Sequence, residues 1–249
     1  METLDAIEKR WGCRKYKDDP IENEVLGLIL NAGRLSPSAG NLQDRAFIIV
    51  KDSGLKTEIS RAAGNQTWMQ TAPIHIVVIS ENRKNGKFFG SKGEKVYSIQ
   101  DTAFATENML IAATDLGLGC SLVVGFNEEK IKDLLKIEPP AEPYAIITLG
   151  KAAETPKPSA KYGLERFVYF DKYGARAVDS ELVFGNIMHA RQLIAEKMIS
   201  WGIEQPQKAT VGFLNRLKSL FKGKKQEEMH DHFMEAPKKE EMPREIPKK

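Results

Sequence analysis

A loop rich in hydrogen-bonding groups runs from Ser36 to Gln43, with the sequence SPSAGNLQ. It carries serine hydroxyls, an asparagine amide and a glutamine amide, and it has almost no side chain that needs burial. Two interpretations follow from these residue types. Ser, Pro, Gly and Asn favour turns, so the stretch is consistent with an ordinary surface loop. Alternatively, its donors and acceptors surround a ligand that is polar and flat.

The common nucleotide and metal motifs are missing. GLGCSL at Gly117 lacks the third glycine of the dinucleotide fingerprint and follows a predicted helix, whereas that fingerprint follows a strand. Neither the P-loop pattern nor the G-x-S-x-G pattern of a nucleophilic serine occurs. His75 lies in an apolar run, and His230 and His232 lie in a polar tail, so no histidine spacing predicts a metal site.

The elements that must position the loop alternate between helices and strands. An N-cap at Asp19, a proline in the first turn and apolar residues at helical spacing predict a helix over 19–33, directly before the loop. Apolar runs predict strands over 46–50, 73–80, 120–124 and 144–150, and further helices are predicted over 53–64, 97–119 and 127–137. This order predicts an α+β fold, a three-layer α/β/α sandwich with helices flanking a small central mixed sheet. The polar, glycine-bearing connection 81–95 is predicted to be mobile or lid-like.

Composition narrows the class of protein. The chain has 249 residues, of which 41% are hydrophobic and 29% charged, and no apolar run is long enough to cross a membrane. A net charge of +3 disfavours a nucleic-acid binder. The N-terminus lacks the apolar core of a signal peptide, and Cys13 and Cys120 are too few for a disulfide framework. We therefore expect a cytoplasmic protein with two buried thiols.

The character of the sequence changes after residue 174. We expect a main domain over 1–174, a helical extension over 175–225 and a disordered charged tail over 226–249. The extension contains a basic amphipathic segment, 212–225, with the sequence GFLNRLKSLFKGKK. Its pattern suits weak contact with an anionic membrane surface or an acidic protein, but equally a helix that packs on its own protein.

Six segments, taken in order, resemble the nitroreductase family of FMN-dependent oxidoreductases. They are RWGCRKY, SPSAGNLQ, the QD at the start of the long predicted helix, its NMLIAATDLGLGC end, ITLGK, and KPSAKYGLERFVYFDKYG. The resemblance covers residues 1–174. It implies a bound FMN, with NADH or NADPH as reductant.

The resemblance also implies which residues bind the cofactor. Arginines and lysines would contact its phosphate, and the SPSAGNLQ loop would lie along the ring, with amides toward the ribityl chain and the polar ring edge. The implied cofactor-binding residues are Arg10, Trp11, Gly12, Arg14, Pro37, Ser38, Ala39, Asn41, Gln43, Leu118, Gly119, Lys151 and Lys161. No catalytic side chain is implied, because the chemistry is that of the flavin.

Several positions depart from the family pattern. Gly12 replaces a small hydroxyl residue, and Lys161 stands where arginine is usual, which keeps the charge but loses the bidentate fork. Asp44 and Arg45 stand where the family often has proline and an aromatic residue. These two residues leave the local shape of the substrate side open.

The activity implied is transfer of a hydride from NADH or NADPH, through the flavin, to a small aromatic acceptor by a ping-pong mechanism. The acceptor would be a nitroaromatic, a quinone or a flavin, and the family implies a homodimer with its site at the subunit interface. Within 81–95, Phe88 and Phe89 are candidates for stacking on the substrate.

Other interpretations stay open at the level of the sequence. Arg10 and Arg14 are consistent with solvated surface arginines, and Gly117 and Gly119 with the end of a helix. The departures above also allow a flavin-binding carrier or a redox-responsive adaptor with little turnover, which would dock a partner or a membrane through its C-terminal segment.

Overall fold

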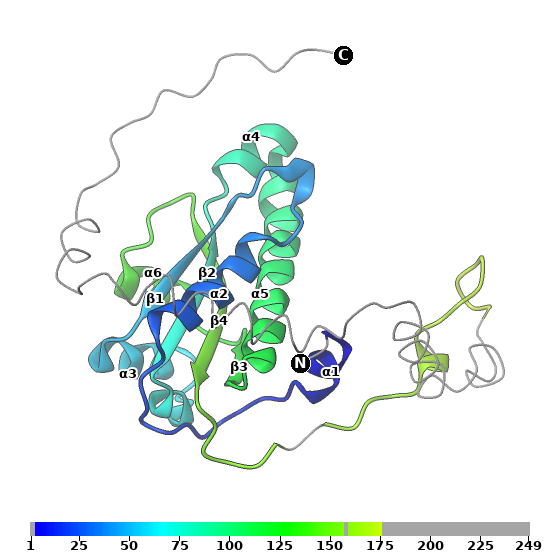
Figure 1. Cartoon of the computed structure of the whole chain (residues 1–249). Helices are drawn as coiled ribbons and strands as arrows, with labels where there is room; N and C mark the ends of the chain where they lie inside the picture. Colours follow the sequence, from blue (N-terminus) through cyan, green and yellow to red (C-terminus); the bar gives the residue numbers. More distant parts are fainter. Residues whose placement is uncertain (1–2, 157–158, 176–249) are drawn as a thin grey trace, which may run out of the picture. The chain divides into compact units, whose positions relative to one another are not determined.

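A computed structural model describes residues 3–156 and 159–175. Its centre is a four-stranded sheet in the order β1-β2-β4-β3 (Figure 1). The strands are β1 (Arg45–Val50), β2 (Ile74–Ser80), β3 (Gly119–Val123) and β4 (Glu142–Gly150). All three strand pairs are antiparallel, so the expected mixed sheet is wrong, although Gly12 and Cys120 form an isolated parallel bridge beside β3.

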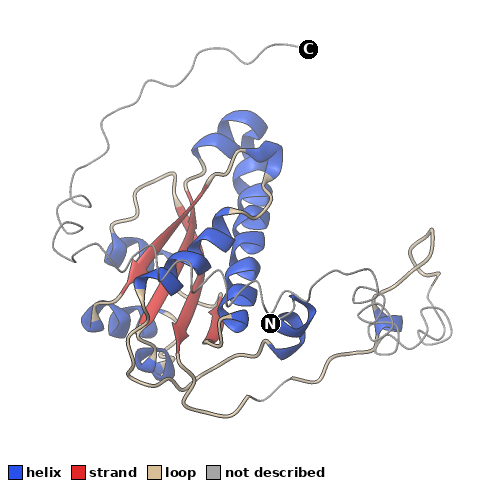
Figure 2. Ribbon diagram, viewed as in Figure 1, coloured by secondary structure: helices blue, strands red, loops and turns tan. Residues whose placement is uncertain are grey.

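Helices flank this sheet (Figure 2). The α-helices are α1 (Thr3–Lys9), α2 (Asn23–Arg34), α3 (Ser53–Ala62), α4 (Arg83–Lys92), α5 (Ser98–Asp115) and α6 (Glu128–Leu135). Shorter helical turns are η1 (Ala39–Asn41), η2 (Thr67–Thr71), η3 (Gly93–Tyr97) and η4 (Leu164–Arg166). No helix in the described ranges is long and apolar enough to cross a membrane. The extension and tail expected after residue 175 lie outside the described residues.

The three layers follow from the alternation of side chains along the strands. Ile74, Ile76 and Val78 of β2 join one core cluster, with α2 and α5 on that face of the sheet. Val77 and Ile79 point the other way and join a second cluster, with α3, η2 and α6. The central strand is therefore buried on both faces, as its continuous apolar sequence predicts. The α+β three-layer prediction is confirmed.

Helix boundaries differ from the sequence prediction where tertiary contacts intervene. The helix predicted from Asp19 begins instead at Asn23, because Ile21 is drawn into the core and Asp19 lies 3.4 Å from the Lys151 ammonium. In α3 the cap is Asp52, whose carboxylate accepts a hydrogen bond from the Leu55 amide at 2.7 Å. The helix predicted over 127–137 is α6, and the Asn127 side chain caps it by accepting a hydrogen bond from the Lys130 amide at 2.9 Å.

His75 is a polar side chain near the start of the buried strand β2. The ring is fully buried, and its Nε2 donates to the carbonyl oxygen of Met69 at 2.9 Å. Burial lowers its pKa from 6.5 to about 4, and the charge of nearby Lys56 acts in the same direction. The folded protein therefore holds this ring neutral at pH values where an unfolded chain would protonate it.

The free energy of unfolding should consequently fall as the pH drops from about 6.5 toward 4, because the unfolded state binds the extra proton. Between pH 7 and about pH 4.5 we expect His75 to account for a loss of about 2 kcal/mol. Urea unfolding at both pH values would measure this loss, with His75→Gln as the variant that lacks the titrating ring. An equal pH dependence in both proteins would contradict the prediction.

Candidate functional site

The N-terminal segment 10–17 lies along the edge of the sheet. The Cys13 amide donates to the Cys120 carbonyl of β3 at 3.0 Å, and the Lys17 amide donates to the Lys151 carbonyl at 2.8 Å. These bonds place the segment beside both β3 and the end of β4. The sequence-predicted residues that they bring together, here called the arginine group, are Arg10, Trp11, Gly12, Arg14, Leu118, Gly119 and Lys151.

Two glycines allow this close approach of backbones. A Cβ on Gly119 would lie 2.8 Å from the Cys13 sulfur, and a Cβ on Gly12 would lie 3.1 Å from the Ser121 hydroxyl. The Ser121 hydroxyl thus lies close to the place where the family resemblance expects a small hydroxyl side chain at position 12. Although Gly12 has no side chain, the hydroxyl of Ser121 on the neighbouring strand β3 lies beside this position.

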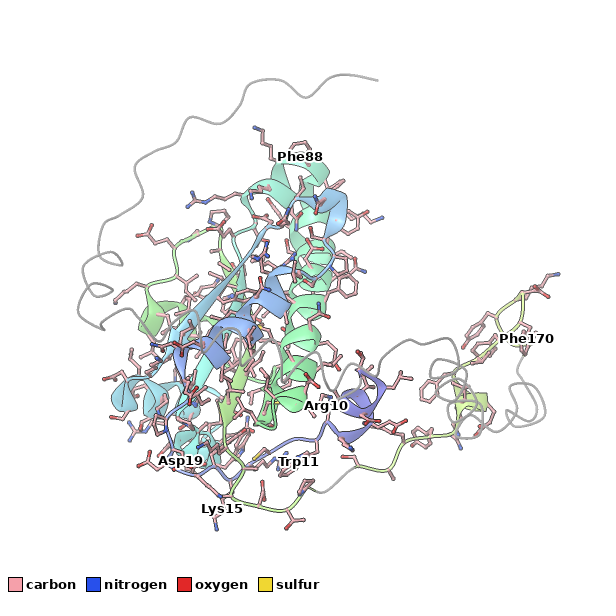
Figure 3. All side chains as sticks on the ribbon, in the orientation of Figure 1. Arg10, Trp11, Lys15, Asp19, Phe88 and Phe170 are labelled. Carbon is pink, nitrogen blue, oxygen red and sulfur yellow. The ribbon has the colours of Figure 1, made fainter. Side chains whose placement is uncertain are left out.

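The cationic side chains of the arginine group have neighbours that sequence reasoning missed. The Arg10 Nε lies 3.6 Å from a Glu107 carboxylate oxygen on α5, and the Arg14 guanidinium lies over the Trp68 ring, 5.6 Å from its centroid. Figure 3 labels Arg10 and Trp11 beside α1. No local motif signals these pairs, because their members lie far apart in the sequence.

A carboxylate also bonds to the backbone of this segment. One oxygen of Glu154 accepts hydrogen bonds from the amides of Arg14, at 2.6 Å, and Lys15, at 3.0 Å. Lys151 pairs with Asp19, as described above. An anionic ligand at this group would therefore share its cations with acidic side chains. Lys161 is exposed on the segment 159–175, and no contact in the described residues ties it to the arginine group.

The loop 36–43 has a defined conformation. Gly40, Asn41 and Gln43 all adopt positive φ angles, of 55°, 54° and 53°. The Gln43 amide donates to the Ser38 hydroxyl oxygen at 3.0 Å, which closes the loop. Pro37, Gly40, Asn41 and Gln43 are exposed, so the amide side chains face outward.

Contacts from other elements fix the base of this loop. The Ala39 amide donates to the Asp101 carboxylate of α5 at 2.9 Å. The Arg45 guanidinium donates to the carbonyls of Arg34, at 2.8 Å, and Ser36, at 2.7 Å. Burial lowers the pKa of Arg45, while the charge of Asp101 opposes that shift. Arg45, one of the positions that depart from the family pattern, thus holds the loop in place through two backbone carbonyls.

The connection 81–95 is helical rather than irregular, forming α4 and the π-helical turn η3. Asp44, which is fully buried, accepts hydrogen bonds from two amides in the first turn of α4. Phe89 lies against the loop, since a Cβ on Gly40 would be 3.1 Å from its ring, and it also contacts Tyr97 edge-to-face. Phe88 is more exposed and lies on α4 at the top of the view in Figure 3.

The structure therefore gathers the predicted residues into two groups. The second, here called the loop group, contains Pro37, Ser38, Ala39, Asn41, Gln43 and Phe89. It lies at the first turn of α5, whereas Leu118 follows the end of that helix. Arg10 lies between these points, beside Glu107, which is about 9 Å from Asp101 along the axis at a rise of 1.5 Å per residue.

The two cysteines are free and buried, as the sequence predicts. Cys13 packs with Tyr16 and Ala72, while Cys120 belongs to the core cluster under α5. Burial raises the pKa of Cys120 to about 11, so its thiol is protonated and unreactive at neutral pH.

Comparison with known proteins gives a consistent result. The model of the Nitroreductase family matches residues 7–66 and 56–151. An "NADH dehydrogenase" of Thermus thermophilus is 26% identical over 195 residues, covering 68% of this chain and 95% of the relative. An "FMN reductase [NAD(P)H]" of Bacillus subtilis is 26% identical over 166 residues, covering 61% of this chain and 67% of the relative. The solved structure of an "FMN-dependent Nitroreductase" from Clostridium difficile R20291 has a TM-score of 0.58 and 26% identity, covering 68% of this chain and 99% of that one.

The packing of Gly119 on Cys13 can be tested by substitution. Gly119→Ala should lower the free energy of unfolding by about 1–3 kcal/mol, because the added methyl overlaps the Cys13 sulfur. Gly125→Ala is the matched control, since a Cβ there meets nothing within 4 Å, and its effect should stay within about 0.5 kcal/mol. Urea unfolding measures both variants. Similar stabilities would show that the N-terminal segment is not packed as described.

Proposed function

This chain belongs to the nitroreductase family, and from that premise we propose that it passes a hydride from NADH or NADPH, through FMN, to a small aromatic acceptor. Family membership makes the protein an NAD(P)H-dependent oxidoreductase with FMN as cofactor. We further propose a ping-pong order and a nitroaromatic, quinone or flavin as the acceptor. The observation that supports FMN-dependent transfer is that the arginine group and the loop group suit the two chemically different ends of FMN.

The residues present fit that cofactor. FMN has a dianionic phosphate at one end and a flat ring with a polar edge at the other. The arginine group offers the positive charges of Arg10, Arg14 and Lys151 for the phosphate. The loop group offers the exposed amides of Asn41 and Gln43 for the ring edge and ribityl chain. Lys161 remains a further candidate for the phosphate.

The protein's part in the reaction is positioning. When bound, FMN supplies the redox chemistry, taking two electrons from reduced nicotinamide and passing them to the acceptor. The cations of the arginine group hold the phosphate, and the left-handed turns at Gly40 and Asn41 bring backbone and amide close to the ring. Reductant and acceptor would occupy the same face in turn, which gives ping-pong kinetics. Phe89, held against the loop, would border that face.

A homodimer would complete the site. The family resemblance implies a flavin site at the subunit interface, formed by loops of both copies. The chain also exposes the apolar side chains of Ile99 and Phe104 on α5, and of Leu122 and Val124 at β3. Part of this surface lines a cleft of about 390 Å³ between α5, β3 and β4. Exposed apolar surface of this kind favours an interface.

Visible absorption of the purified protein, followed by release of the cofactor, tests the function. We expect about one FMN per chain and oxidation of NADH or NADPH with a quinone or nitroarene as acceptor. Arg10→Ala should raise the Kd for FMN by about tenfold or more, because a charge-assisted contact with the phosphate is lost. Arg61→Ala, on exposed α3, is the control and should leave the Kd unchanged. A protein that takes up no FMN would refute the proposal.

The interface can be tested at the two edges of the sheet. Leu122→Glu, on β3, should convert the dimer to monomer and abolish tight FMN binding, because a charge would be buried between the copies. Ile49→Glu places the same charge on an exposed position of β1, the opposite edge, and should leave the dimer intact. Sedimentation velocity would measure the assembly. If both variants stay dimeric, the interface does not include Leu122 of β3.

A further inference from the structure

Two buried carboxylates lie beneath the loop group. Asp101, at the start of α5, is 1% exposed. One of its oxygens accepts the Ala39 amide at 2.9 Å, and the other accepts the side-chain amide of Asn85 in α4 at 3.2 Å. A single side chain on α5 therefore contacts both the proposed cofactor loop and the helix that carries Phe89.

The second carboxylate holds the same helix by its backbone. Asp44 follows the loop directly, and one of its oxygens accepts the amides of Lys84, at 3.0 Å, and Asn85, at 2.9 Å. The N-cap residue of α4, Asn82, makes no side-chain capping bond of its own. Asp44 thus takes over the role of a helix cap from a distant part of the chain. Asn85 is held through its backbone by Asp44 and through its side chain by Asp101.

The far end of α4 is fixed by close backbone packing. A Cβ on Gly93 would lie 2.1 Å from the Asn85 carbonyl oxygen, so η3 packs directly on the first turns of α4. The Ser98 hydroxyl donates to the Gly93 carbonyl at 3.0 Å and accepts the Asn85 side chain at 3.2 Å. The residues Asp44, Asn85, Ser98 and Asp101 form one connected set, here called the buried polar cluster.

The buried polar cluster contributes little to the free energy of unfolding, because several of its atoms and of the neighbouring Arg45 are buried without a partner in the described part of the chain. The Asp44 Oδ1, the Asn85 Oδ1 and two nitrogens of Arg45 are buried and have no hydrogen-bond partner among the described residues. Burying polar and charged groups without full pairing costs free energy, and apolar side chains would often fill such space at lower cost. A function in positioning explains why polar groups occupy this space.

We propose that Asp101 is a positioning residue that makes the SPSAGNLQ loop and the start of α4 move as one unit. The inference rests on the proposed function, since the loop is the proposed contact of the flavin ring. Because Phe89 lies against Gly40 within the same unit, the distance from the ring edge to Phe89 is fixed. The helix α4 is then not a lid that opens by itself, and the acceptor enters past a rigid border.

Amide hydrogen exchange of the full chain without FMN tests the unit directly. Asn85→Ala removes the link to Asp101 but leaves the bond between Asp101 and the Ala39 amide. With this link cut, α4 should open without the loop, so the Lys84 amide should exchange about tenfold faster while the Ala39 amide, still bonded to Asp101, is unchanged. Asp133→Asn, at an exposed position of α6, is the control and should change neither. Equal acceleration at Ala39 and Lys84, or none at either, would overturn the proposal.

A second pair of variants distinguishes a loss of positioning by Asp101 from a general loss of folding. Asp101→Asn brings two amide side chains together at Asn85, whereas the double variant Asp101→Asn with Asn85→Asp exchanges donor and acceptor and restores the bond. We expect Asp101→Asn to raise the Kd for FMN and the KM for the acceptor by about tenfold each, with a smaller effect on kcat, and the double variant to recover most of the loss.

The two readouts also distinguish the two proposals. If wild-type protein binds no FMN, the proposed function fails, while hydrogen exchange still decides whether the loop and α4 move together. If FMN binds and neither its Kd nor the acceptor KM responds to Asp101→Asn, the positioning role is overturned. Failure of the double variant to recover binding, although it is folded by circular dichroism, would also count against it.

Discussion

The packing of α5 on the central sheet is the constraint on which the rest of the structure depends. Met109, Leu110 and Ala113 are buried in the core cluster that also contains β2 and β4. Since an apolar face of this size excludes water, the position and direction of the helix are fixed. Both groups of candidate residues take their place from it, one at its first turn and the other from Glu107 to beyond its end.

Charged side chains are arranged differently in the arginine group and beneath the loop group. At the arginine group, carboxylates lie close to exposed cations, where solvent screens each pair and its energy is small. Beneath the loop, Asp44 and Asp101 are buried and accept hydrogen bonds from amides. Exposed charges can be shared with an anionic ligand, while buried ones hold backbone in place.

Much of the fold is readable from local pattern, and the errors have physical causes. Strands and long helices are correct because their apolar residues repeat with the expected period. The predicted start of α2 at Asp19 is wrong because burying Ile21 in the core stabilises the fold more than another helical turn would. The segment 81–95 has the composition of a loop but folds as α4, since its cap, Asp44, lies about forty residues earlier in the sequence.

The sequence by itself determined the order of elements, the family resemblance and the residue types for an anionic, flat cofactor, because these depend on composition and local spacing. Only the tertiary structure decided that the candidates fall into two groups, with Glu107 at Arg10 and Trp68 at Arg14. It alone also revealed the link from Asp101 to both Ala39 and Asn85. Contacts between residues far apart in a chain arise from packing, which no local pattern records.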